Sequence, residues 1–285
     1  MKQNSLRENG MKLLFLISAC VSVAAVLLIC LFLFGSGIPT IVKVGPLDFL
    51  SGSAWKPGND IYGIFPMIIG SIYVTAGALI IGVPVGIFTA VFMARFCPPR
   101  LYSLLKPVVD LLAGIPSVVY GFFGLMVIVP ALSDMFGGSG KSMLAASIVL
   151  GIMILPTVIS VSETSIRAVP DSYYEGALAL GASHERSVFR VVLPAAKSGV
   201  MAAIVLGVGR AIGETMAVIM VAGNQPVLPS SITKGLRTLT ANIVLEMSYA
   251  QDLHREVLIA TGAVLFVFIL IINVCFSLIK KKAKI

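Results

Sequence analysis

Six long apolar stretches restrict what this sequence can fold into. A helix needs about 20 residues to cross the roughly 30 Å hydrocarbon core of a membrane, and every one of these stretches is long enough. With 58% hydrophobic and only 12% charged residues, the chain cannot be an ordinary water-soluble domain. We therefore expect an all-α integral membrane protein with six transmembrane helices, at approximately 13–34, 64–94, 108–133, 142–164, 199–223 and 256–279.

Basic residues precede the first stretch, as they do in a secretory signal peptide: Lys2, Arg7 and Lys12. Against cleavage, the apolar run at 13–34 is longer than the core of about 7–15 residues in a signal peptide, and no small-x-small site closes it. We expect this run to be a retained span.

Lysine and arginine are shared unevenly between the segments on the two sides of the membrane. With the N-terminus inside, the inner segments hold 14 of the 21 basic residues and the outer segments hold 6, while Arg210 lies within a span. Cytoplasmic loops of membrane proteins carry the excess of basic residues. Both termini and the loop at 165–198 are therefore expected in the cytoplasm.

The segment at 170–194 is the longest internal stretch that is neither strongly apolar nor rich in glycine and proline. Asp171 follows a proline and is placed to cap a short helix, which Gly181 is placed to end. Ser183 is placed to cap a second helix that stops near 193–194. Two short helices in a loop of a membrane protein suit docking onto a partner.

The residues of this loop resemble the cytoplasmic EAA loop of ABC-importer permeases. The matching positions are Glu175, Gly176, Ala177, Gly181, Leu193 and Pro194, with Gly176 standing where the general signature has alanine. The resemblance implies the ABC type I importer permease architecture, and it makes these residues the loop that couples the chain to a partner ATPase. It also requires the loop to face that ATPase, which agrees with the orientation inferred from the basic residues.

The third stretch contains the run Gly114-Ile115-Pro116-Ser117, followed by Tyr120. A helix broken by glycine and proline, with serine and tyrosine beside the break, is a place where a polar path through the membrane is lined. The alternative is a kink whose backbone groups are satisfied by neighbouring helices. The run also resembles the GIPSVVYGFFG segment of phosphate-importer permeases, which favours Ser117 and Tyr120 as pathway residues.

The fifth stretch carries two charges, Arg210 and Glu214, inside an apolar segment. A charged side chain at the middle of the bilayer costs about 2.5–3.5 kcal/mol on insertion scales, so it is by default a functional hypothesis. The two residues are four positions apart, so about 40° separates their side chains on the helix and they can pair with each other. The guanidinium fork suits a tetrahedral oxyanion, and Glu214 would hold it in place when no anion is present. The alternative is a buried ion pair that only fastens helices together.

The run Arg210-Ala-Ile-Gly-Glu214-Thr215 resembles the corresponding run of phosphate-specific, Pst-type permeases, and the residues that follow are more similar to the PstC than to the PstA member. In that family the arginine and the glutamate are implicated in phosphate passage. By position, the resemblance assigns this role to Arg210 and Glu214. Thr215, Ser117 and Tyr120 are expected as further residues of the substrate pathway.

Two glycine-rich runs invite a nucleotide site, and neither fits. The run at 137–142 has Met135 where a phosphate-binding loop needs its first glycine. The run at 207–209 is followed by Ile212 where the dinucleotide motif needs its third glycine. We therefore expect no cofactor in this chain, with ATP and magnesium bound by a partner ATPase.

Metal and disulfide chemistry are not expected either. His184 and His254 stand alone in the sequence, without the spacing of metal ligands. The four cysteines are scattered and contain no CxxC motif. The net charge of +8 reflects the orientation of the chain in the membrane, and no feature points to nucleic acid.

The remaining polar and small residues have simpler interpretations. Glycines in the second stretch let helix backbones approach closely, and a proline is expected to kink it. These residues are Gly70, Gly77, Gly82, Gly86 and Pro84. Glu163, near the cytoplasmic edge of the fourth stretch, is interpreted as an interfacial residue.

The outer segments carry two further features. Trp55, in the segment at 35–63, is interpreted either as an anchor at the membrane interface or as a contact for an extracytoplasmic partner. In the segment at 225–255, apolar residues recur at three- and four-residue spacing, which predicts an amphipathic helix at the outer surface. They are Ile232, Leu236, Leu239, Ile243 and Met247.

The resemblance implies a permease subunit of an ATP-driven, binding-protein-dependent importer of inorganic phosphate, in a bacterial-type inner membrane. The chain itself would perform no covalent chemistry. Its expected partners are membrane lipid, a second, PstA-like permease, a PstB-like ATPase dimer docked on the EAA loops, and an extracytoplasmic PstS-like phosphate-binding protein. The expected domains are an N-terminal helix with its outer loop at 1–63, a permease domain at 64–279 with the EAA loop at 170–194, and a basic cytoplasmic tail at 280–285.

Three other functions stay open from the sequence. The same machine can carry another oxyanion, such as sulfate or molybdate. A secondary transporter can use Arg210 and Glu214 to couple protons, without a partner ATPase. A membrane enzyme acting on phosphorylated lipids would need a nucleophile or a cluster of metal ligands, and two isolated histidines without clustered carboxylates argue against it.

Overall fold

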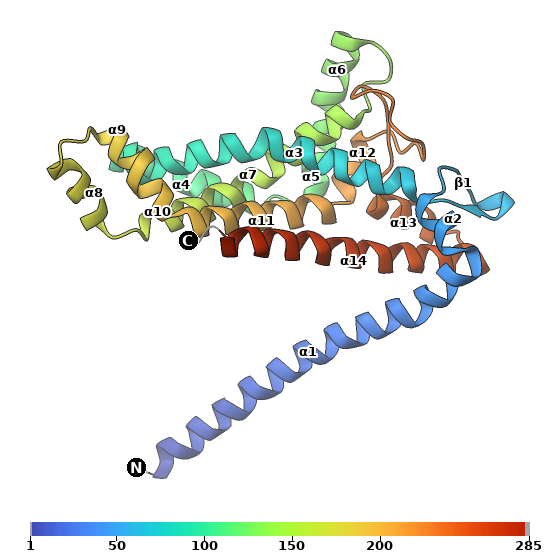
Figure 1. The fold of residues 1–285 in the computed structure, drawn as a ribbon, viewed down its shortest axis with the longest axis horizontal. Coiled ribbons are helices and arrows are strands. Elements are labelled where there is room, and N and C mark those ends of the chain that lie inside the picture. Colours follow the sequence, from blue (N-terminus) through green and yellow to red (C-terminus); the bar gives the residue numbers. More distant parts are fainter. Residues whose placement is uncertain (1, 283–285) are drawn as a thin grey trace.

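The computed structural model describes residues 2–282, which form a helical bundle with one long helix leaving it (Figure 1). The helices are α1 (Lys2–Val44), α2 (Pro46–Ser51), α3 (Phe65–Val91), α4 (Pro99–Gly114), α5 (Ser117–Phe123), α6 (Val129–Phe136), α7 (Met143–Arg167), α8 (Asp171–Ala179), α9 (His184–Ser187), α10 (Leu193–Ala195), α11 (Lys197–Gly213), α12 (Met216–Val221), α13 (Leu239–Met247) and α14 (Asp252–Lys282).

Shorter elements connect these helices. Three stretches of π-helix extend or join them: η2 (Phe92–Phe96) after α3, η3 (Gly124–Ile128) between α5 and α6, and η4 (Val188–Val192) between α9 and α10. Two short strands, β1 (Trp55–Lys56) and β2 (Ile61–Tyr62), pair antiparallel around the 3-10 turn η1 (Pro57–Asn59). They form a small hairpin with Trp55 opposite Tyr62.

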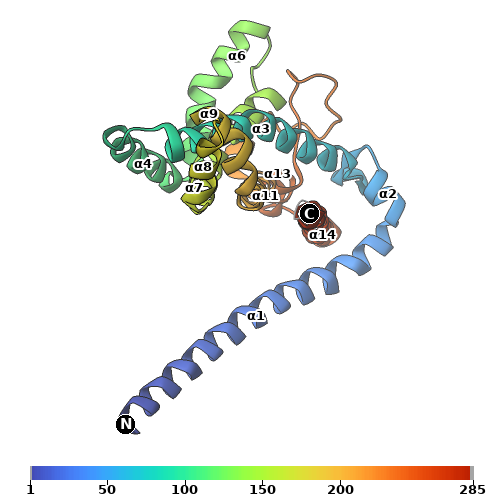
Figure 2. The ribbon, with the colours of Figure 1, turned by 60° about the vertical axis from the view of Figure 1, so that its left-hand side comes forward.

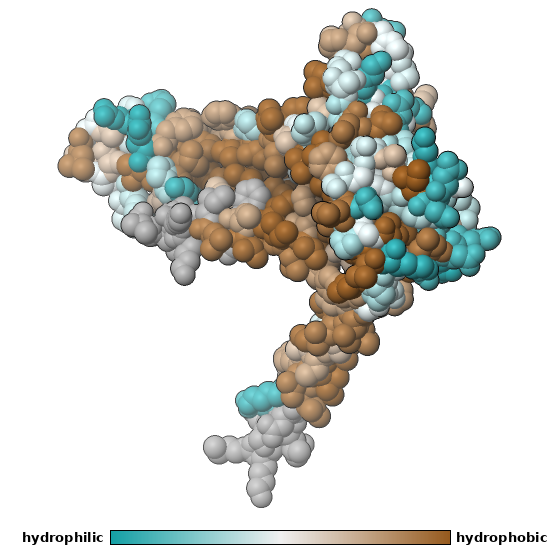
Figure 3. All heavy atoms as spheres, turned by 45° about the vertical axis from the view of Figure 1, so that its right-hand side comes forward, coloured by the Kyte–Doolittle hydropathy of each residue, from teal (hydrophilic) through white to brown (hydrophobic). Residues whose placement is uncertain are grey.

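Within residues 2–282, five helices are long and apolar enough to cross a membrane: Gly10–Val44, Phe65–Phe96, Ser117–Phe136, Met143–Arg167 and Asp252–Cys275. A sixth candidate is a bent pair, His184–Ala195 followed by Lys197–Gly213, with 69° between its parts. Hydrophobic residues cover α1 and the middle of the bundle, whereas hydrophilic residues gather toward its two ends (Figure 3). The expected all-α membrane architecture is confirmed.

The third and fifth expected spans are interrupted. Residues 108–114 belong to a separate helix, α4, because residues 115–116 have extended backbone and the residue before a proline disfavours helix. The apolar span therefore begins at Ser117. The fifth expected span, at 199–223, divides into α11 and α12 because Glu214 also has extended backbone.

The central helix of the bundle is α7. In its most apolar part 61% of the residues are buried, against 33% or less in the other four long spans. It packs against α3, α4, α5, α11 and α12. Its inward-facing residues form the middle of the main hydrophobic core: Val149, Leu150, Met153, Ile154 and Val158.

Glycines of α3 let this helix approach α7 closely, as the sequence predicts. A Cβ atom at Gly82 would lie 2.6 Å from the carbonyl oxygen of Gly151. A Cβ atom at Gly77 would lie 2.3 Å from the hydroxyl oxygen of Ser147. Non-bonded atoms do not approach so closely, so a larger residue at either position must push the two helices apart.

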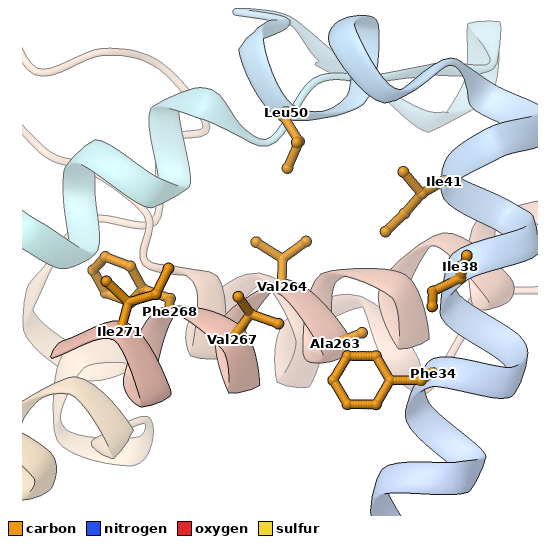
Figure 4. Close-up of a pocket in the computed structure, with 9 residues that line it drawn as sticks. All are labelled: Phe34, Ile38, Ile41, Leu50, Ala263, Val264, Val267, Phe268 and Ile271. Carbon is orange, nitrogen blue, oxygen red and sulfur yellow. The ribbon is translucent and has the colours of Figure 1, made fainter. Parts of the chain in front are cut away.

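The C-terminal part of α1 contacts the bundle, and the helix diverges from the bundle toward the N-terminus (Figures 1 and 2). Gly37 of α1 lies against Ala260 and Ala263 of α14, whereas the large apolar residues in 11–32 are exposed. Such a surface suits the hydrocarbon of a membrane. The diverging helices leave an apolar crevice of about 400 Å³ (Figure 4), lined by Phe34, Ile38, Ile41, Leu50, Ala263, Val264, Val267, Phe268 and Ile271.

The expected cytoplasmic tail is described only in part. Helix α14 runs to Lys282, so residues 283–285 of the tail lie outside the described residues. The cytoplasmic position of both termini and the division at residues 63 and 64 stay predictions.

Replacing Gly82 by alanine is expected to lower the stability of the protein, because the added methyl group meets the Gly151 carbonyl. Overpacking of this kind costs about 1–3 kcal/mol. The measurement is the midpoint of thermal unfolding in detergent. The control is Gly35→Ala in α1, where an added Cβ meets nothing within 4 Å. Equal midpoints for the two variants would contradict the close packing of α3 on α7.

Candidate functional site

The predicted pathway residues lie where two neighbouring helices are interrupted. Residues 115–116 separate α4 from α5, and residues 214–215 separate α11 from α12. Helix α5 packs directly on α12, since a Cβ atom at Gly121 would lie 2.8 Å from the Cα atom of Ala217. Interrupted helices at membrane depth are tolerated where they are buried in protein or line a water-filled path.

Arg210 lies in the last turn of α11 and is half-buried. Its Nη1 group donates a hydrogen bond to the hydroxyl oxygen of Thr157, 3.1 Å away on α7. Thr157 directly follows Pro156, which is inside that helix. Reasoning from the sequence missed Thr157, although a proline-threonine pair inside an apolar stretch is a signal for such a position.

The predicted pair of Arg210 with Glu214 is absent from the ion pairs of the described residues. The prediction assumed a continuous helix, whereas Glu214 follows the end of α11 with extended backbone. Its carboxylate instead accepts a hydrogen bond from the backbone N–H of Ala217 at 3.0 Å, in the first turn of α12. Glu214 therefore satisfies a free N–H group at a helix start. Among the described residues, Arg210 has no carboxylate partner.

Tyr120 bridges the first interruption. It is buried on α5, and its hydroxyl donates a hydrogen bond to the carbonyl oxygen of Leu112 on α4 at 2.7 Å. The structure therefore joins Arg210 of α11 to Thr157 of α7, and Tyr120 of α5 to Leu112 of α4, by side-chain hydrogen bonds.

The other two predicted pathway residues lie at the interruptions themselves. Ser117 is the first residue of α5 and is half-buried. The hydroxyl of Thr215 donates to the carbonyl oxygen of Gly213 at 3.3 Å. The site thus combines one cation with hydroxyl groups and interrupted backbone, a set that suits a polar anion better than an apolar ligand.

A short helix, α13, lies against the second interruption. The Thr240 hydroxyl donates a hydrogen bond to the backbone carbonyl of Glu214 at 3.1 Å. The predicted surface helix is wrong, because α13 begins only at Leu239 and both Leu239 and Asn242 are fully buried. Ile232 is exposed in the preceding loop. Packing of α13 against α3 and α14 overrides the amphipathic pattern.

Glu214→Ala is expected to destabilise the protein, because it removes the acceptor for the Ala217 N–H at the start of α12. Loss of a side-chain acceptor at a helix start costs about 0.5–2 kcal/mol. Glu214→Gln keeps an acceptor oxygen and is expected to unfold at the wild-type temperature. Thermal unfolding of both variants in detergent checks this. An equal drop for the two would show that the charge, and not the hydrogen bond, stabilises this turn.

The loop at 170–194 forms the two predicted helices. Gly181 ends α8 with a φ of +84°, and its N–H bonds back to the carbonyl oxygen of Leu178 at 2.9 Å. A positive φ at this position favours glycine. Ser183 caps α9, since its hydroxyl oxygen accepts from the backbone N–H of Arg186 at 3.3 Å.

Asp171 does not cap α8 as predicted. The capping position is Pro170, which has no side-chain bond. Asp171 pairs instead with Arg95 of η2, with 2.9 Å between Oδ1 and Nη1. Arg95 also donates to the carbonyl oxygens of Ile166 and Val169, at 3.4 and 3.3 Å. The loop is thereby fastened to the ends of α3 and α7.

The predicted coupling residues form an accessible surface at the tip of this loop. Glu175, Gly176, Gly181 and Pro194 are exposed, Leu193 is half-buried and Ala177 is buried. Beside them Leu180 is 92% exposed, an unusual position for a leucine. An apolar tip next to acidic and basic side chains has the character of a docking surface for another protein.

Glu163 is not the interfacial residue that the sequence suggests, since it is only 2% exposed near the end of α7. It accepts hydrogen bonds from Tyr102 at 2.9 Å and Lys106 at 3.3 Å, both on α4, and it pairs with Arg167. Burial alone would lower the pKa of Lys106, but its bonds to Glu163 and Asp110 outweigh burial and raise it. This cluster, which we call the inner Glu163 cluster after the predicted orientation, fastens α4 to α7.

Neither histidine is isolated in the fold. Nδ1 of His184 lies 2.7 Å from the Tyr174 hydroxyl, and Nε2 of His254 lies 2.8 Å from the Glu246 carboxylate. Trp55, expected at the membrane interface or against a partner, is buried and donates to the same carboxylate at 2.9 Å. In the part of the chain that the structure describes, no three metal-ligating side chains come together.

A bundle of apolar spans, a cation where two helices are interrupted, and an exposed helical loop at one end define a membrane transport protein. The chain belongs to the family described as binding-protein-dependent transport system inner membrane component, whose model matches residues 82–285. The permease family identified from the EAA signature is therefore confirmed. The protein is a transport subunit of the inner membrane and not an enzyme.

Relatives with assigned names agree with this family. The chain is 41% identical over 271 residues to the probable ABC transporter permease protein YqgH of Bacillus subtilis, covering 90% of this chain and 88% of that one. It is 34% identical over 246 residues to the phosphate transport system permease protein PstC of Mesorhizobium japonicum, covering 79% of this chain and 75% of that one.

A solved structure shows the same fold at low sequence identity. The chain matches a bacterial ABC transporter involved in the import of the acidic polysaccharide alginate with a TM-score of 0.62 and 14% identity. The match covers 94% of this chain and 96% of that chain. The ABC importer permease architecture is therefore confirmed, including the divergent first helix within the matched length.

Proposed function

We propose that this chain is the permease subunit of an ATP-driven, binding-protein-dependent importer of inorganic phosphate. The observation that carries the proposal is Arg210, a half-buried cation whose partner among the described residues is the neutral hydroxyl of Thr157. No carboxylate of the described residues lies within 4.0 Å of this cation, so its remaining N–H donors are available to an entering anion. The relatives named as phosphate transport permeases support phosphate among the oxyanions.

The surroundings of Arg210 suit a tetrahedral oxyanion. A guanidinium presents its N–H donors in a plane and bonds two oxygens of a phosphate group at once. Thr157 occupies one nitrogen and fixes the orientation of the group. An anion at this point would exchange its hydration shell for fixed donors.

The coupling loop suits a partner ATPase. We propose a PstB-like ATPase dimer, which binds ATP and magnesium, as the occupant of the exposed surface around Glu175 and Leu180. The Arg95–Asp171 pair would carry a push on α8 into the end of α3. A second, PstA-like permease would complete the pathway, and a PstS-like binding protein would deliver phosphate from the outer side.

Helix α4 offers a second route from the inner end of the bundle to the site. The inner Glu163 cluster fastens one end of α4 to α7. At its other end the carbonyl oxygen of Leu112 accepts the hydrogen bond from Tyr120, one of the proposed pathway residues. A rigid displacement of α4 would therefore move the Leu112 carbonyl and, with it, Tyr120 in the proposed pathway.

Another oxyanion, such as sulfate or molybdate, would use the same guanidinium. Competition by sulfate or molybdate during phosphate uptake distinguishes these substrates. A proton-coupled secondary transporter would need no ATPase, and the family description, which names a binding protein, favours the ATP-driven machine.

Arg210→Gln is expected to reduce phosphate uptake by about 10- to 100-fold, because the loss of a charge-assisted hydrogen bond costs about 1.5–3 kcal/mol. The measurement is ATP-dependent uptake of radiolabelled phosphate into proteoliposomes that hold the full complex. The matched control is Arg255→Gln, an exposed arginine on α14. Uptake at the wild-type rate by an assembled Arg210→Gln complex would contradict the proposed role of this cation.

Gly181→Ala is expected to weaken the association of the ATPase with the permease, because alanine adopts a φ of +84° only with strain. The strain costs about 1–2 kcal/mol, so the amount of ATPase that co-purifies should fall about 5- to 30-fold. Gly176→Ala is the control, since this exposed helical position has open space around it and alanine favours helix. Equal co-purification in both variants would count against docking on this loop.

A further inference from the structure

A buried carboxylate at the end of the bundle opposite the coupling loop is not used by the proposed pathway. Glu246 of α13 has a side chain that is 7% exposed. It accepts hydrogen bonds from three other segments: Trp55 Nε1 at 2.9 Å, His254 Nε2 at 2.8 Å and Arg237 Nη1 at 2.5 Å. We call Trp55, Arg237, Glu246 and His254 the outer Glu246 cluster.

The hydrogen bonds of this cluster involve both oxygens of Glu246. Arg237 donates to Oε1, whereas Trp55 donates to Oε2 and His254 Nε2 lies within hydrogen-bonding distance of the same oxygen. Buried ion pairs stabilise a fold poorly compared with apolar packing, so the more informative property of such a cluster is the geometry that it holds.

One side of the cluster is the hairpin β1–β2. The rings of Trp55 and Tyr62 meet edge to face at 5.7 Å, and each lies 6.1 Å from the His254 ring. Burial, and then a bond to Asp60, raises the pKa of Tyr62 to about 12, so its hydroxyl remains a donor to that residue. The hairpin thus has a buried root on the cluster and an exposed tip at residues 58–61.

The other side of the cluster is the segment around α12. Nε of Arg237 donates to the carbonyl oxygen of Asn224, just beyond α12, at 2.9 Å. Thr240, three residues after Arg237, donates to the carbonyl oxygen of Glu214, just before α12, at 3.1 Å. Both ends of α12 are therefore held by residues 237–240, and Glu246 holds Arg237 in turn.

Two buried polar atoms around Arg237 lack a partner among the described residues: Asn224 Oδ1 and Asn242 Nδ2. Arg237 bonds to both of these residues, through the carbonyl oxygen of Asn224 and through Oδ1 of Asn242. An unpaired acceptor and an unpaired donor beside one arginine are costly in a single fixed structure.

We propose that Glu246 is a positioning residue for transport, which acts on the pathway through Arg237 and Thr240. It fixes α13 in the position in which the Thr240 hydroxyl bonds the Glu214 carbonyl. Glu214 directly follows α11, the helix that carries Arg210. The hydrogen bond from Trp55 to Glu246 connects this position of α13 to the hairpin. A binding protein that contacts the hairpin on the outer side would therefore change the position of α12. This inference rests on the proposed function as an ATP-driven, binding-protein-dependent importer.

The test is a double-mutant cycle in the full complex, reconstituted in proteoliposomes. The readout is the ratio of ATP hydrolysis with and without the binding protein of the same transport system. Glu246→Gln and Thr240→Val are each expected to lower this ratio about tenfold, and the double variant is expected to lower it no further, because groups in one network are not additive. Glu256→Gln is the matched control, since that glutamate on α14 is 53% exposed.

Multiplied effects in the double variant, about a hundredfold, would overturn the proposal, because independent sites are additive in free energy. An unchanged ratio for Glu246→Gln would overturn it as well. If the Glu246→Gln complex does not assemble, Trp55→Phe takes its place in the cycle, because it keeps the ring and removes one donor. Trp55→Phe is then expected to lower the ratio by less than Thr240→Val does, and the double variant is expected to match Thr240→Val alone. A double variant that falls further than Thr240→Val, or an unchanged ratio for Trp55→Phe, contradicts the proposal.

The phosphate assignment is tested separately in the same preparations. Absence of phosphate uptake by the wild-type complex, with ATP hydrolysis still stimulated by the binding protein, overturns phosphate as the substrate. The cycle on Glu246 uses the stimulated hydrolysis alone, so its outcome stands apart from that result.

Discussion

Backbone groups inside a membrane must find partners within the protein, and this requirement organises the site. Two helices are interrupted at neighbouring positions, and side chains satisfy the freed groups. Tyr120 bonds the Leu112 carbonyl, Glu214 bonds the Ala217 N–H, and Thr240 bonds the Glu214 carbonyl. The residues that the sequence marks as pathway residues are thus also the ones that make the interruptions tolerable. If the proposed pathway is correct, transport depends on the same hydrogen bonds that hold the interrupted helices together.

The charges of the bundle follow a clear division. Near the two ends, buried carboxylates are surrounded by basic partners, Glu163 by Lys106 and Arg167, and Glu246 by Arg237 and His254. Between them Arg210 rests on a threonine hydroxyl. The ionic contacts of the described residues thus fasten helices near the two ends of the bundle, whereas Arg210 is held by a neutral partner, as the proposed role in anion passage requires.

Features set by local chemistry could be predicted from the sequence. Apolar length identifies the spans, Gly181 and Ser183 mark the two loop helices, and glycine spacing anticipates the contact of α3 with α7. Features set by tertiary geometry could not. Spacing places Arg210 and Glu214 on one helical face only if the helix continues, and it ends between them. The bond between Trp55 and Glu246 joins residues 191 positions apart, which no periodicity reveals.

The divergence of α1 has a consequence for how such a chain evolves. The family match begins at residue 82, beyond this helix, and the core centred on α7 is built without it. A helix that contributes no residue to that core can change in length or sequence without disturbing the packing of α7. Substitutions on the exposed face of α1 are therefore constrained by its lipid neighbours and not by the interior of the bundle.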